Sequence, residues 1–82
     1  MTVTVQGYTT LTGNPNVILR LMQDARLFQS QPEDPDEYIK SVQQTAWRCY
    51  GIPLNVTGDT IPERAESLLR EMAKHDLIKI TE

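Results

Sequence analysis

The chain has 82 residues, and its eleven acidic and eight basic residues give a formal net charge of −3. A chain of this length forms one small domain, residues 1–82, and is too short to enclose much of a catalytic pocket. Its basic residues are scattered rather than clustered, which argues against a surface that neutralises nucleic-acid phosphates.

Cys49 is the only cysteine, so the chain has no disulfide framework, and a single thiol suits a reducing compartment. The sequence opens without a charged and then apolar leader, and no apolar run approaches the roughly 20 residues of a membrane span. We therefore expect a cytoplasmic protein with no membrane partner.

The first predicted element is a strand. Thr2 to Val5 alternates threonine and valine, which is the period-two pattern of a strand with one buried face. Gly7 can bulge or turn this strand, so Tyr8 to Leu11 forms either its continuation or the return arm of a hairpin. The sequence leaves both alternatives open.

The first predicted helix begins at Asn14, a good N-cap, with Pro15 in its first turn, and runs to about Phe28. Helical spacing places on one face the residues Val17, Ile18, Leu21, Met22, Ala25 and Phe28. Leu19 and Leu27 lie off this face, so the helix is apolar on more than one side. Either the helix is wedged between two neighbours in the core, or its second face contacts a partner.

The second predicted helix begins at Asp34 and Pro35 and ends at Gly51. Its apolar side is formed by Tyr38, Ile39, Val42, Thr45, Ala46, Cys49 and Tyr50. Trp47 lies nearly opposite Tyr38 on the helical wheel and is therefore predicted to point away from that side.

The connector at 52–59 alternates apolar and polar residues, which indicates a short extended segment. The third helix begins at Thr60, which fits a capping box with Glu63. One stripe of this helix is apolar and is formed by Ile61, Ala65, Leu68, Leu69, Met72 and Ala73. From Leu77 to Ile80 the pattern changes to the period two of a strand.

These segments predict an α+β fold, a three-helix domain with a small sheet. Pairing the N-terminal strand (or hairpin) with the C-terminal strand shields the last strand and brings both termini together. Such a small sheet depends on its packing against the helices.

Four carboxylates fall within five positions, at Glu33, Asp34, Asp36 and Glu37. A hard cation such as calcium prefers oxygen ligands, but the glycine and distal glutamate of an EF-hand are absent. Acidic residues also gather at a helix N-terminus because they interact favourably with its dipole. We adopt this second interpretation and predict no metal site.

His75 and Cys49 are the candidates for a catalytic base and nucleophile. They belong to different predicted elements, and Cys49 falls on the apolar side of its helix, where a buried, inert thiol is expected. His75 is a single histidine at a helix end, where the dipole favours its protonated form, and zinc would need three or four ligands. The sequence predicts no catalytic residue, no cofactor and no enzymatic activity.

Trp47 is the strongest candidate for contact with a partner. A tryptophan off the apolar side of its helix either covers the edge of the core or anchors an interface. The predicted binding patch consists of Trp47, Arg48, Leu19 and Leu27. We expect a non-enzymatic protein-interaction or adaptor module, whose partner is either another protein or a second copy in a homodimer.

The alternative is a winged-helix-like nucleic-acid-binding domain. The passage from Leu69 to Ile80, a helix that ends directly in an aliphatic strand, resembles the end of a winged-helix recognition helix. However, Glu63 and Glu66 begin the exposed face of this helix, where a recognition helix would offer side chains that contact bases or phosphates. We therefore expect no nucleic-acid partner.

Overall fold

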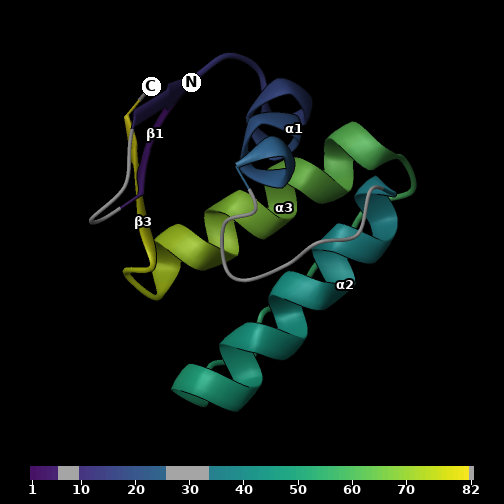
Figure 1. The fold of residues 1–82 in the computed structure, drawn as a ribbon, viewed down its shortest axis with the longest axis vertical. Coiled ribbons are helices and arrows are strands. Elements are labelled where there is room, and N and C mark those ends of the chain that lie inside the picture. The colour runs from purple at the N-terminus through teal and green to yellow at the C-terminus, as the bar shows by residue number, and fades with distance from the viewer. Residues whose placement is uncertain (6–9, 26–33, 82) are drawn as a thin grey trace.

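The structure is a computed structural model that describes residues 1–5, 10–25 and 34–81. In chain order its elements are β1 (Thr2–Val5), β2 (Thr10–Thr12), α1 (Pro15–Asp24), α2 (Pro35–Thr45), the π-helical turn η2 (Ala46–Tyr50), α3 (Ile61–Lys74) and β3 (Ile78–Thr81). The predicted α+β fold is confirmed, with three α-helices and a small sheet in which the first and last strands pair (Figure 1).

The sheet is antiparallel, with the strand order β2-β1-β3. Val3 lies opposite both Leu11 of β2 and Ile80 of β3, so the N-terminal segment forms a hairpin rather than one long strand. Gly7, the predicted turn, lies outside the described residues. Because side chains alternate along a strand, the buried Val3 and Val5 place Thr2 and Thr4 on the opposite face of the sheet.

The core lies between the sheet and the helices, and α3 contacts β3 and both other helices. Every element except β2 contributes to the core, together with one residue of the connector after η2. Its members are Val3, Val5, Ile18, Leu19, Met22, Tyr38, Ile39, Val42, Ala46, Leu54, Ala65, Leu68, Leu69, Met72 and Ile78. The predicted stripe of α3 is confirmed at its centre, with Ile61 and Ala73 half-buried at its ends.

All three predicted N-caps form. The Asn14 side chain accepts from the Val17 amide at 2.9 Å, and the Asp34 carboxylate accepts from the Asp36 amide at 2.8 Å. The Thr60 hydroxyl accepts from the Glu63 amide at 3.4 Å and donates to the Glu63 carboxylate at 2.8 Å. These side chains satisfy amides that have no partner inside the helix, so the start of each helix is specified locally.

The predicted apolar face of α1 is confirmed at Ile18 and Met22 and is wrong at Val17 and Leu21. Ile18, Leu19 and Met22 are buried, whereas Val17 and Leu21 are 42% and 38% exposed. The helix has two overlapping apolar stripes, and α3, α2 and β2 all contact α1. These neighbours cover the side on which Leu19 lies, which the sequence of α1 alone does not specify.

Candidate protein-interaction site

The C-terminal end of α2 projects away from the rest of the molecule. In Figure 1 it is the lowest part of the ribbon, beyond the sheet and the other helices. Among the described elements, η2 has appreciable contact only with α2, from which it continues. Ala46 is the last buried residue along this helix, and the four residues from Trp47 to Tyr50 are all exposed.

Two aromatic side chains dominate this projecting end. Trp47 is 63% exposed and Tyr50 is 58% exposed, more than any other large hydrophobic residue among those described. Arg48 is exposed between them and adds a positive charge. We call Trp47, Arg48 and Tyr50 the aromatic tip.

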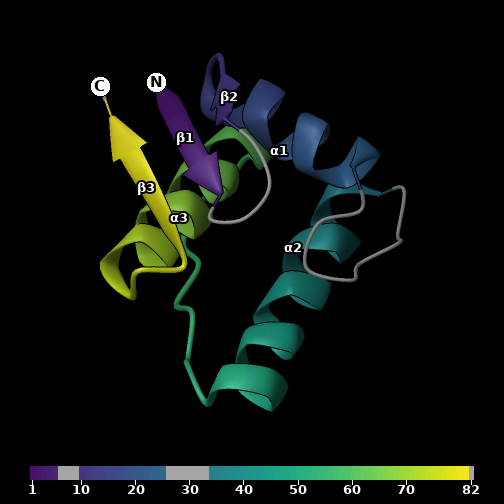
Figure 2. The same ribbon diagram turned by 60° about the vertical axis from the view of Figure 1, so that its left-hand side comes forward.

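The local chain chemistry explains how the helix ends here. Gly51 adopts the left-handed conformation at φ 66° and ψ 25°, which glycine enters without a Cβ penalty. Its amide donates to the Trp47 carbonyl at 3.0 Å, and the Ile52 amide donates to the Ala46 carbonyl at 3.1 Å. Pro53 then prevents the helix from continuing. The chain turns back, and Figure 2 shows it returning toward α3.

The base of the tip is fixed to the body of the molecule. Leu54, just after the turn, is only 5% exposed and belongs to the core. The side-chain amide of Gln43, on α2, donates to the Leu54 carbonyl at 2.8 Å. The helix and the returning chain are therefore tied together one turn before Trp47, and the aromatic tip extends from a held base.

The structure brings together only part of the predicted patch. Trp47 and Arg48 are both exposed on the tip, and Leu27 lies outside the described residues. Leu19 is 1% exposed and packs in the core, so this member of the prediction is wrong: its side chain cannot contact a partner.

Tyr50 is the residue of the tip that the sequence reasoning missed. The wheel placed it and Cys49 on the buried side of the helix, and both are exposed. A regular wheel assumes 3.6 residues per turn, whereas the π-helical turn from Ala46 is wider and changes the direction of the side chains that follow. The available signal was Gly51, which ends the helix immediately after Tyr50.

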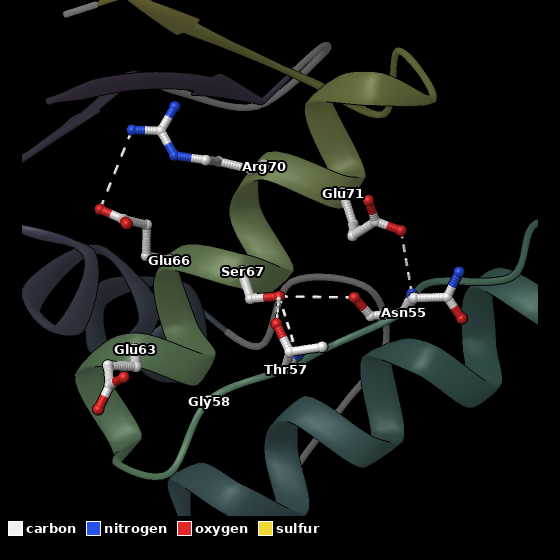
Figure 3. Close-up of a pocket in the computed structure, with 8 residues that line it drawn as sticks. All are labelled: Asn55, Thr57, Gly58, Glu63, Glu66, Ser67, Arg70 and Glu71. Atoms are coloured by element: carbon white, nitrogen blue, oxygen red, sulfur yellow. Dashed lines mark hydrogen bonds and ion pairs between the residues drawn. The ribbon is translucent and has the colours of Figure 1, made fainter.

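A second feature is an open polar hollow of about 420 Å³ between α3 and the connector (Figure 3). Ser67 and Glu71 point from α3 toward the connector. The Thr57 amide donates to Ser67 Oγ at 2.9 Å, and the Asn55 amide donates to Glu71 Oε1 at 3.1 Å. These side chains satisfy backbone groups of an extended segment, so we assign them to holding the connector against α3.

The remaining charged residues of α3 are also engaged. Arg70 and Glu66 form an i,i+4 ion pair, with 3.9 Å between Nη2 and Oε1, along the same hollow. Arg64 forms an ion pair with Asp36 that connects α3 to α2. Two of the four clustered carboxylates therefore have structural roles: Asp34 caps α2, and Asp36 pairs with Arg64. Glu33 lies outside the described residues.

His75 and Cys49 lie on separate elements. His75 is half-buried at the C-terminal end of α3, and Cys49 is exposed on η2. Among the described residues, no group of three His, Cys, Asp or Glu side chains is arranged to hold a metal ion. No helix within the described ranges has the length and apolar character needed to cross a membrane.

Comparison with known proteins yields no matching family model, no matching curated protein and no matching solved structure.

Proposed function

We propose that this chain is a protein-interaction module that docks through the aromatic tip. The observation that supports this function is the exposure of Trp47 and Tyr50, 63% and 58%, on a helix end that projects beyond the core. Tryptophan is highly buried on average in folded proteins. Trp, Tyr and Arg, the three residue types of the tip, are also the types enriched among residues that dominate interface energies.

Docking would gain free energy mainly by removing the two aromatic side chains from water. Each such side chain buries roughly 150–250 Å² when it is fully covered, at about 25 cal/mol per Å². With more than half of each still exposed, their burial would contribute on the order of 5 kcal/mol before the cost of association. Arg48 would add hydrogen-bond donors for a carboxylate at the rim of the partner's pocket.

The construction of the tip favours this use. Helical segments with π geometry occur frequently at functional sites. The bond from Gln43 to the Leu54 carbonyl and the turn at Gly51 hold the base of the tip in place. Binding would therefore cost less conformational entropy than binding through a loop, because the aromatic tip is already ordered.

The alternative of nucleic-acid binding receives no comparable support. The hollow beside α3 is lined by three glutamates, Glu63, Glu66 and Glu71, and by one arginine, Arg70, which pairs with Glu66. A surface of this charge repels phosphates.

The proposal is tested by affinity capture with immobilised wild type, Trp47→Ala and Leu21→Ala, followed by quantitative mass spectrometry. Leu21 is the matched control, because it is a large exposed hydrophobic residue on α1, outside the tip. We expect a binding protein that is retained by wild type and Leu21→Ala and reduced at least about tenfold by Trp47→Ala, as for loss of a hot-spot residue. Equal retention by all three chains would contradict the proposal, provided circular dichroism shows that each is folded.

A further inference from the structure

β3 is the open edge of the sheet. The strand order β2-β1-β3 leaves it paired with β1 alone, and Figure 2 shows it on the outer side, with α1 beside β2. Within the described part of the chain, no backbone group bonds to its outer side. An unpaired strand edge is a template for another strand.

One hydrogen bond fixes the direction of the backbone groups in β1. The Gly13 amide donates to the Met1 carbonyl at 3.1 Å, so Met1 directs its backbone groups toward β2. In an antiparallel pair these directions alternate, so Val3 also faces β2. Thr2 and Thr4 therefore direct their N–H and C=O groups toward β3.

The register between β1 and β3 determines which backbone groups of β3 point outward. Thr2 and Thr4 lie opposite Thr81 and Lys79, so these two residues of β3 bond to β1. Ile78 and Ile80 alternate with them, and their N–H and C=O groups consequently point outward, away from the sheet.

The side chains of β3 restrict what can pair with this edge. Ile80 is half-buried on the inner face, in one row with Val3 and Leu11. Lys79 is exposed on the outer face, in one row with Thr4. An added strand must place an apolar side chain beside Ile80, and it must not place a positive charge beside Lys79.

We propose that the edge of β3 pairs with the edge of β3 in a second copy of this chain, antiparallel and centred on Ile80. Two-fold symmetry then places Ile80 against Ile80 of the second copy, continuing the apolar row, and places Lys79 against Thr81 of the second copy. Centring the pair on Lys79 would set two lysines directly opposite, which is destabilising. Lys79 thus selects the register, and the two sheets join into one. This surface is separate from the aromatic tip.

The dimer is expected to be weak. Two strands of four residues each bury much less than the roughly 800 Å² per partner of a stable interface. It should therefore appear only at high protein concentration, at about 100 μM or above.

A first test measures mass by light scattering across a concentration series. The wild type should rise from 9.4 kDa toward twice that mass. Ile80→Pro removes an N–H that points outward, so the ladder with β1 stays intact while edge pairing is lost, and this variant should remain monomeric. Trp47→Ala should dimerise like wild type, because the tip is not part of this contact.

A second test captures the register by disulfide formation in a Cys49→Ser background. A hydrogen-bonded antiparallel pair has its Cα atoms about 5.5 Å apart, within the range that a disulfide spans. Ile80→Cys should therefore form a covalent dimer on mild oxidation, and Thr81→Cys, whose symmetry mates are offset, should not.

Three results would overturn the inference: a strict monomer at every concentration, equal cross-linking at both positions, or a dimer that Trp47→Ala abolishes and Ile80→Pro leaves intact. The last would leave the proposed role of the aromatic tip standing. Conversely, edge pairing without any partner that depends on the tip would support the β3 dimer and would not support docking through the aromatic tip.

Discussion

Tyr38 is the largest side chain that is completely buried in the described part of the core. Its burial raises the pKa of the phenol above its ordinary value near 10, because the ionised form would lose its hydration. Two tyrosines of this helical segment therefore differ in burial. Tyr38 packs in the core at the start of α2, whereas Tyr50 is exposed at the end of η2.

The raised pKa of Tyr38 predicts that the fold loses stability in alkali. Below about pH 10 both the folded and the unfolded chain keep the phenol proton, so this group contributes no pH dependence. Above that pH the unfolded chain releases the proton first, so the folded state binds more protons and the free energy of unfolding falls. Urea unfolding should show a decline of up to about 1.4 kcal/mol per pH unit.

Tyr38→Phe is the control for this decline, because it keeps the ring and removes the group that titrates. Its free energy of unfolding should fall less steeply than that of wild type between about pH 10 and pH 11. Identical slopes for the two chains would show that the Tyr38 phenol does not govern the alkaline loss.

Among the elements, α1 provides the most direct test of packing. Leu19 and Leu21 are the same residue type two positions apart on one helix, yet Leu19 is 1% exposed and Leu21 is 38% exposed. Leu19→Ala should lower the free energy of unfolding by about 2–5 kcal/mol, because it leaves a cavity. Leu21→Ala should lower it by about 0.5–1 kcal/mol. Urea unfolding of both variants decides this, and the reverse order would mean that α1 presents its other side to the core.

The sequence was sufficient for features that depend on neighbouring residues. The sequence predicted where each helix begins, because the side chains of Asn14, Asp34 and Thr60 accept hydrogen bonds from amides within the next turn. The stripe of α3 and the pairing of the first and last strands follow from periodicity and from the need to shield a strand. Each of these signals lies within a few residues or has few alternatives.

Features that depend on tertiary contacts were not predictable in the same way. The rotation of α1 is set by α3, α2 and β2, which cover one of its two apolar stripes. For the candidate site, the helical wheel placed Trp47 away from the apolar side of the helix, and Trp47 is exposed. The wheel failed for Tyr50 because the last turn is a π-helix. Leu19 is not available to the predicted patch because these same neighbours bury the side of α1 on which it lies.

In the whole molecule, the two proposed contact surfaces lie far apart. Figure 1 shows the sheet and both termini at the upper left and the end of α2 at the bottom. Occupation of the tip would leave the β3 edge accessible, and pairing of the sheets would leave the tip accessible. A dimer formed through β3 could therefore present two aromatic tips to partners, which increases apparent affinity when both are engaged together.

The decisive measurement is acrylamide quenching of Trp47 fluorescence, since Trp47 is the only tryptophan in the chain. In dilute native protein, with Trp47 63% exposed, we expect quenching nearly as strong as in the urea-unfolded chain and an emission maximum close to that of the unfolded state. Emission that is blue-shifted and protected from acrylamide in a dilute monomer would mean that Trp47 covers the core. The aromatic tip would then not be free to bind a partner.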